Sequence, residues 1–133
     1  MNQSLDRRVR ERAKNRCEYC KLPASISVFT FPIDHIIAQQ HGGATTFENL
    51  ALSCPHDNYH KGPNIAGLDP ETGRLTRLFN PRRQRWSAHF AWAGPLLVGK
   101  TAVGRTTIRV LNMNHPEAVR LRRLLIEAGL FPP

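Results

Sequence analysis

The spacing of three cysteines constrains the fold of this chain more than any other feature. Cys17 and Cys20 form a C-x2-C pair, and Cys54 follows after a long insert with Asp57 three residues beyond it. Two thiolates in one tight turn can take adjacent corners of a tetrahedral zinc site. The pattern therefore predicts a structural zinc site that joins two distant segments. The alternative is that the thiols pack as small buried hydrophobes.

The fourth zinc ligand is either Asp57 or His56. Asp57 stands at the position that the ligand spacing requires, whereas His56 would complete the commoner structural set of three cysteines and one histidine. Both alternatives stay open. A site without metal also stays open, since a chain of this length can bury a core without a metal staple.

Composition favours a polyanionic partner. The chain has 19 Lys+Arg against 10 Asp+Glu, a net charge of +9, and each phosphate that a basic residue neutralises releases condensed counterions. Nucleic acid is therefore the first candidate.

The sequence has no apolar run as long as a membrane span, about 18 residues, and its first residues lack a signal-peptide core. We expect a cytoplasmic protein without a membrane partner, whose odd cysteine count argues against a disulfide framework.

Residues 31–62 gather most of the side chains that can bind a metal or move a proton. An apolar run typical of a strand, residues 28–37, contains Pro32 and the polar pair Asp34-His35. Two glycines then open a loop, residues 49–53 return as a second strand, and residues 55–62 suit a short helix with proline in its first turn. The expected order is strand, loop, strand and short helix, closed by the zinc knuckle.

Five motifs follow one another in this region: R-C-E-Y-C, I-D-H-I-I, H-G-G-x-T, N-L-A-L-x-C and D-N-x-x-K-G. In this order they resemble the HNH nucleases, in the variety whose ββα-metal hairpin is braced by a zinc knuckle. The resemblance implies an α+β fold within a single domain, 1–133. An N-terminal helix would precede an HNH core at 13–63, and a C-terminal extension of strands and helices, 64–133, would pack on that core.

The resemblance also implies roles for individual residues. His35 matches the general base, Asn49 the middle asparagine and Asn58 the third signature residue, which makes this an H-N-N version. Asp34, together with Asn58, matches the group that holds the catalytic divalent ion, Mg²⁺ or Mn²⁺. The implied activity is metal-dependent hydrolysis of phosphodiester bonds in DNA, with duplex DNA as the expected substrate.

The chemistry of these residue types supports the same roles. An imidazole is neutral near pH 7 and can take a proton from water. Carboxylate and amide oxygens, as in Asp34 and Asn58, are ligands that Mg²⁺ accepts while keeping several waters. Asn49 can hydrogen-bond across the loop to fix either the imidazole or the turn.

The remaining regular structure is predicted from periodicity and capping signals. Ser4 is the expected cap of the N-terminal helix. After residue 62 the pattern predicts strands at residues 74–79 and 106–111, followed by a final helix that Asn114 caps and Gly129 ends.

Several basic residues are candidates for nucleic-acid contact: Lys61, Arg82, Arg83 and Arg85. The three arginines precede Trp86, Phe90 and Trp92, so this segment could line a nucleic-acid groove. The alternative is that Trp86 and Phe90 pack one helical face into the core while the arginines stay exposed.

Two functions remain open at this point. The alternative to an endonuclease is a catalytically inactive, zinc-braced module that only binds nucleic acid. The Asp34-His35 pair favours the enzyme, since binding alone needs neither a base nor a hard-metal carboxylate in an apolar run. A Cys-His nucleophile enzyme is disfavoured, because all three cysteines stand at zinc spacing.

Overall fold

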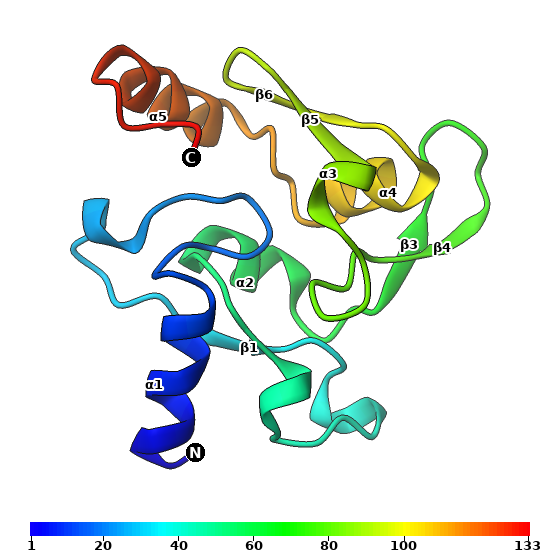
Figure 1. Cartoon of the computed structure of the whole chain (residues 1–133). Coiled ribbons are helices and arrows are strands. Elements are labelled where there is room, and N and C mark those ends of the chain that lie inside the picture. Colours follow the sequence, from blue (N-terminus) through cyan, green and yellow to red (C-terminus); the bar gives the residue numbers. More distant parts are fainter.

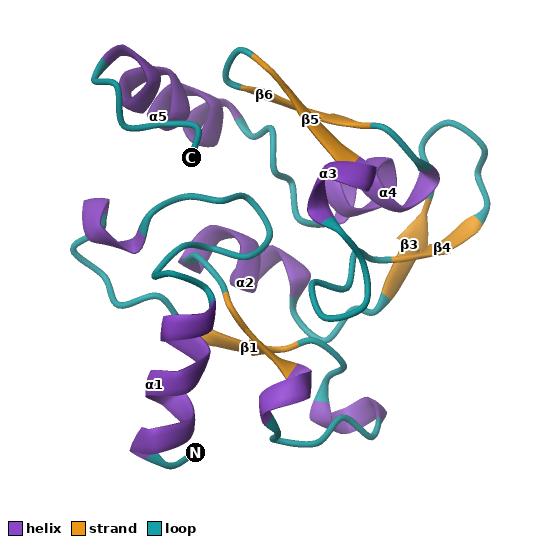
Figure 2. Ribbon diagram, viewed as in Figure 1, coloured by secondary structure: helices purple, strands orange, loops and turns teal.

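The chain folds as an α+β structure with five α-helices and three two-stranded antiparallel sheets (Figures 1 and 2). A computed structural model describes all residues, 1–133. The helices are α1 (Gln3–Arg12), α2 (Pro55–Lys61), α3 (Trp86–His89), α4 (Ala102–Val110) and α5 (Pro116–Glu127). The strands are β1 (Ile33–His35), β2 (Leu50–Leu52), β3 (Ala66–Leu68), β4 (Leu75–Arg77), β5 (Phe90–Ala93) and β6 (Leu96–Gly99). The predicted fold class is confirmed.

The order strand, loop, strand, short helix is present in β1, β2 and α2. Ile33 pairs with Leu52 and His35 with Leu50, and α2 follows β2 almost directly. Strand β1 is shorter than the predicted apolar run. Val28 and Phe29 lie in a loop with 94% and 72% of their surface exposed, because Pro32 interrupts the run and β2 offers only three residues for pairing.

Helix α1 is fixed to the hairpin through its arginines. Its cap is Asn2, whose side chain accepts from the Leu5 amide at 2.7 Å, and not the predicted Ser4. Arg12 donates to the carbonyls of Phe47 and Leu50 at 2.6 and 2.5 Å, and its guanidinium lies over the Phe47 ring. This part of the basic sequence therefore serves packing.

In the C-terminal extension, the first of the two predicted strands is confirmed and the second is wrong. Residues 75–77 form β4, paired with β3, whereas residues 106–110 belong to helix α4. The β-branched residues suggested a strand, but Thr101 caps the helix by accepting from the Gly104 amide at 3.1 Å. The Thr107 hydroxyl donates to the Val103 carbonyl at 2.7 Å. Tertiary contacts with β3, β4 and β6 then stabilise the helix.

The final helix, α5, is correctly predicted apart from its cap. His115, not Asn114, caps the helix and accepts from the Glu117 amide at 3.1 Å. The side chain of Asn114 instead binds both the amide and the carbonyl of Leu97 in β6, at 2.9 and 2.8 Å. Gly129, with φ at +72°, follows the end of the helix as predicted.

One core joins the two halves of the chain, which Figure 1 shows as the blue-to-green lower part and the green-to-red upper part. Its 16 buried residues include Tyr19 and Leu52 from the first half and Phe79 and Leu111 from the second. Trp86 stacks near Phe90 and Trp92, with ring centroids 5.1 and 5.5 Å away. These aromatic residues therefore pack, as the second interpretation of this segment expected. They do not share one helical face, because Phe90 already begins β5.

None of the helices combines the length and the apolar character that crossing a lipid bilayer requires.

Two neighbouring threonines of α4 test this packing. The Thr107 hydroxyl also accepts from the buried amide of Phe79 at 2.8 Å, whereas the buried Thr106 hydroxyl has no hydrogen-bond partner. We expect Thr107→Val to lower the free energy of unfolding by about 1–3 kcal/mol, since it leaves a buried donor unpaired. Thr106→Val, the matched control, should be neutral or stabilising. Urea unfolding of both variants measures the difference in stability. Equal losses of unfolding free energy would contradict a stabilising hydrogen bond between the Phe79 amide and the Thr107 hydroxyl.

Candidate functional site

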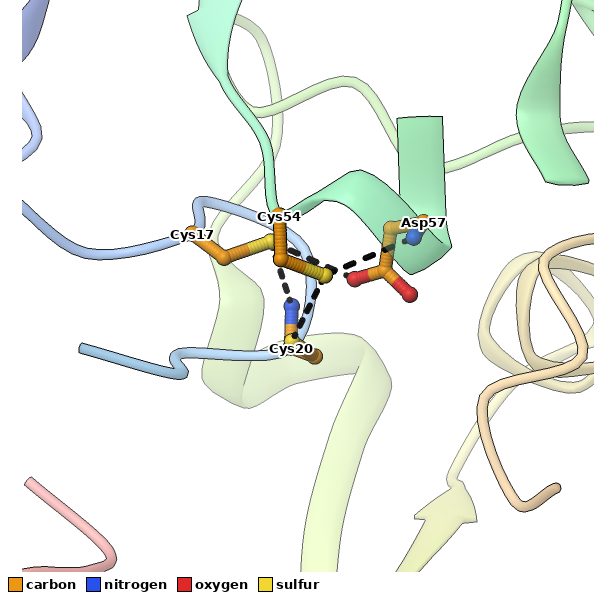
Figure 3. A group of neighbouring side chains, drawn as sticks. All are labelled: Cys17, Cys20, Cys54 and Asp57. Atoms are coloured by element: carbon orange, nitrogen blue, oxygen red, sulfur yellow. Dashed lines mark hydrogen bonds between the residues drawn. The ribbon is translucent and has the colours of Figure 1, made fainter. Parts of the chain in front are cut away.

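Three cysteines and one aspartate form a buried group, the Cys3Asp cluster: Cys17, Cys20, Cys54 and Asp57 (Figure 3). One ligand atom from each lies within 4.8 Å of all the others. Two ligands come from the loop after α1, and two from the first turn of α2, where Cys54 is the N-cap. The Cys17 sulfur lies 3.2 Å from the Asp57 carboxylate, and the sulfurs of Cys20 and Cys54 lie 3.7 Å apart.

The cluster has the chemistry of a zinc site. Three thiols, none in a disulfide, and one carboxylate are ligands that Zn²⁺ takes in tetrahedral sites. Burial, together with the Cys17 sulfur, raises the pKa of Asp57 well above its usual range. A charged carboxylate at this position therefore requires a cation beside it, and a bound Zn²⁺ would meet that requirement.

Of the two candidates for the fourth ligand, the structure brings only Asp57 to the thiols. His56 lies outside the cluster, and its Nε2 is 2.8 Å from the carbonyl of Asn112. Its ring lies 4.4 Å from that of His60 and 6.0 Å from that of His115. The arrangement agrees with the spacing argument for Asp57 and not with the general preference for histidine; zinc binding by Asp57 stays a prediction.

A second site is an open cleft of about 370 Å³ that brings together Asp34, His35 and Asn58. Asp34 and His35 come from β1, and Asn58 from the middle of α2. The side chain of Asn58 forms no hydrogen bond with the protein, so both its amide oxygen and its amide nitrogen are available to a ligand. Of the four residues that the sequence predicted for catalysis and for the catalytic ion, three therefore share one cleft, and Asn49 does not line it.

The imidazole of His35 is oriented by a threonine. Its Nε2 lies 2.8 Å from Thr45 Oγ1, and the side-chain amide of Gln39 donates to the same oxygen at 3.3 Å. The other ring nitrogen, Nδ1, has no hydrogen-bond partner in the protein. Thr45 is the last residue of the H-G-G-x-T motif, but the sequence alone indicated no role for it.

Asn49 fixes the loop between His35 and Thr45. Its Oδ1 accepts from the Ile37 amide at 2.9 Å, and its Nδ2 donates to the carbonyls of Ile37 and Ala44 at 3.0 and 2.8 Å. The loop passes so close to Ile37 that a Cβ on Gly43 would lie 1.7 Å from the Ile37 carbonyl oxygen. Of the two uses suggested for Asn49, it therefore has the geometry to fix the turn and does not touch the imidazole.

The carboxylate of Asp34 takes part in a buried network. Its Oδ2 accepts from the Tyr19 hydroxyl at 2.7 Å, and the Lys61 ammonium lies 3.0 and 3.2 Å from its two oxygens. The ammonium also donates to the carbonyls of His35 and Ile36, at 3.0 and 3.1 Å. Burial raises the pKa of Asp34, although the Lys61 charge opposes this shift. Tyr19 escaped prediction because it appeared to be only a spacer in the C-x2-C pair.

Two of the predicted nucleic-acid contacts are wrong. Lys61 is only 1% exposed and its ammonium is fully engaged inside the protein. Arg82 forms an ion pair with Glu18 at the C-x2-C turn, and its Nε and Nη1 are buried without a partner. Each of these two charges is paired with an acidic residue inside the protein, which the sequence alone did not indicate. Arg83 and Arg85 are exposed, and their contact with nucleic acid stays a prediction.

Comparison with known proteins agrees with this geometry. A family model described as HNH endonuclease matches residues 17–64, the segment that contains both the Cys3Asp cluster and the cleft. The predicted resemblance to the HNH endonucleases is therefore confirmed, and the match of residues 17–64 supports a function of the nuclease type.

The chain is also similar to a named protein, the Septu protein PtuB of Bacillus thuringiensis. The two are 25% identical over 118 residues, which cover 87% of this chain and 43% of that protein. The chain thus spans less than half the length of this curated relative. No solved structure matches the chain significantly.

The Cys3Asp cluster leads to a prediction about metal content. We expect the purified protein to contain about one zinc per chain, held by the four cluster residues. Asp57→Ala should lose zinc to a chelator much faster than the wild type, whereas His56→Ala should retain it. Elemental analysis and a colorimetric chelator assay give both values. Thiols that react fully in the folded wild-type protein, with no zinc present, would exclude the site.

Proposed function

We propose that the chain is a divalent-ion-dependent endonuclease that hydrolyses phosphodiester bonds in duplex DNA. The main support is that an imidazole, a carboxylate and a free amide share one open cleft, inside the segment that matches the HNH endonuclease model. Phosphodiester hydrolysis needs an activated water and stabilisation of negative charge on the phosphate and the leaving oxygen. The cleft has residues suited to each task.

His35 acts as the general base in this proposal. Its Nε2–H donates to Thr45 Oγ1, an assignment consistent with their separation of 2.8 Å, so the lone pair of Nδ1 is available to a water molecule. As the water oxygen attacks phosphorus, Nδ1 takes its proton and the bond from phosphorus to the leaving oxygen breaks. Thr45 keeps the imidazole in the productive tautomer and orientation.

Asp34 and Asn58 would hold the divalent ion, Mg²⁺ or Mn²⁺. When bound, the ion neutralises charge on the scissile phosphate and on the leaving oxygen. The donor set fits a hard cation: the amide oxygen of Asn58 is free, and Asp34 Oδ1 has Lys61 as its single partner, so it keeps a lone pair. Lys61 orients the carboxylate and holds the end of β1 through two carbonyls.

The Cys3Asp cluster would serve as the structural brace. It ties the start of α2 to the knuckle, and α2 is the helix that carries Asn58. Zinc in the cluster would therefore fix the position of Asn58 relative to the residues of β1, without contacting the substrate.

A second candidate function is binding of nucleic acid without hydrolysis. It is favoured by one observation: Asp34 is already satisfied by Tyr19 and Lys61, so the folded state does not require a catalytic ion. The two functions differ in one measurable property, namely cleavage in the presence of a divalent ion.

Substitution of His35 distinguishes these functions. We expect the wild-type protein to relax supercoiled plasmid with Mg²⁺ or Mn²⁺ and to be inactive in EDTA. His35→Ala should reduce the rate by a factor of about 10²–10⁴, the usual contribution of a general base, while its affinity for DNA stays nearly unchanged. His41→Ala is the control, since His41 is exposed on the neighbouring turn. Undiminished cleavage by His35→Ala would remove His35 from this role.

Thr45 provides a finer test of the orientation of the base. Thr45→Val removes the hydroxyl at constant volume, and we expect kcat to fall on the order of tenfold with little change in KM, since the imidazole loses its fixed direction. Thr45→Ser should restore most of kcat. Steady-state kinetics on a fluorescent duplex measures this, and a loss that serine does not restore would indicate a packing role.

A further inference from the structure

A groove of about 180 Å³ lies beside the cleft, between the HNH segment and the C-terminal extension. On one side it is lined by Ile36 and Lys61. Ile36 follows His35 directly, and Lys61 is next to Gly62, which lines the cleft. On the other side it is lined by β4 and the loop after it, which lie outside the matched HNH segment. The HNH segment and the C-terminal extension therefore form the groove together, and it adjoins the cleft that contains His35.

The available polar groups of this groove are donors. Asn80 Oδ1 accepts from the Arg82 amide and Gln84 Oε1 accepts from the Asn80 amide, both at 2.9 Å, so each side-chain amide is left with its NH₂ group. Arg77 and Arg83 are exposed and form no ion pair in the protein. The lining contains no aspartate or glutamate. Such a surface binds a ligand rich in acceptors and negative charge.

The other half of the lining is apolar. Ile36, Ile37, Ile65 and Phe79 contribute to it. An apolar surface bordered by guanidinium groups suits a nucleotide of a DNA strand, because the phosphate accepts hydrogen bonds from the arginines and the deoxyribose covers the apolar side chains. A metal ion would be repelled by the arginines and would leave the apolar side chains uncovered.

We propose that this groove binds one nucleotide of the DNA strand next to the scissile phosphate, with Arg77 and Arg83 on its backbone phosphate. The proposal rests on the proposed function, since it takes the cleft as the site of cleavage. The C-terminal extension then has a direct role, because it supplies Arg77 and Arg83, which lie outside the matched HNH segment, for contact with the DNA strand. Of these two arginines, only Arg83 was indicated by the sequence.

The first test measures binding in the inactive His35→Ala background without divalent ions. Arg77→Gln with Arg83→Gln should weaken binding to a short DNA duplex and reduce the slope of log K against log salt by about 1, the value expected for one lost phosphate contact. Arg120→Gln with Arg123→Gln is the control. Both residues are exposed on α5, at the other end of the molecule (Figure 1), and their loss changes net charge equally. If the two double variants lose DNA affinity equally, the proposal that the groove binds a nucleotide is contradicted.

The second test locates the ligand directly. The isoleucine methyl groups of Ile36, Ile37 and Ile65 report on the groove by NMR, while those of Ile108 and Ile126 lie outside it. Addition of the duplex should shift the first three signals and leave the last two unchanged. If the duplex binds but the three signals do not move, the groove proposal fails even where plasmid cleavage is observed. Shifts without any cleavage by the wild-type protein would contradict the proposed function and support the groove.

Discussion

The Cys3Asp cluster is the constraint on which the rest of the structure depends. Little regular structure links α1 to β1, and the four buried side chains of the cluster pack that segment against α2. Tyr19 stands between two of the ligands and reaches the carboxylate of Asp34. Lys61 then joins Asp34 to the backbone of His35. The Cys3Asp cluster and the candidate catalytic residues are thus connected through a short series of hydrogen bonds.

The C-terminal extension attaches to the same turn. Glu18 binds the Leu52 amide and forms the ion pair with Arg82, while the Tyr19 carbonyl accepts from the Trp86 indole at 2.8 Å. Glu18 and Tyr19, the two middle residues of the C-x2-C pair, therefore each contact both the hairpin and the extension. Removing the extension would leave Glu18 as a buried charge without its cation, which is strongly destabilising.

The sequence predicted the parts of this structure that rest on spacing and order. The two halves of the Cys3Asp cluster, the order of β1, β2 and α2, and the shared cleft all follow from motifs whose residue types match a known chemistry. Local signals were less reliable. Residues 106–110 looked like a strand because their β-branched side chains favour one, and only contacts with three distant strands make them helical.

Burial of charged residues was the main feature that the sequence did not reveal. Lys61 and Arg82 read as surface cations, yet each neutralises an acidic residue far away in the chain. A side chain's charge indicates that it needs a partner but not whether that partner is a phosphate or a buried carboxylate. Net charge therefore favours a polyanionic ligand without indicating which basic residues would bind it.

The central claim is that Asp34, His35 and Asn58 form one hydrolytic site. It is tested most directly by crystallography of His35→Ala with a DNA duplex and Mn²⁺, using the anomalous signal of manganese. We expect a peak in the cleft that contacts a phosphate oxygen and the side-chain oxygens of Asp34 and Asn58. Manganese bound elsewhere, with DNA away from the cleft and Asp34 still held only by Tyr19 and Lys61, would contradict it.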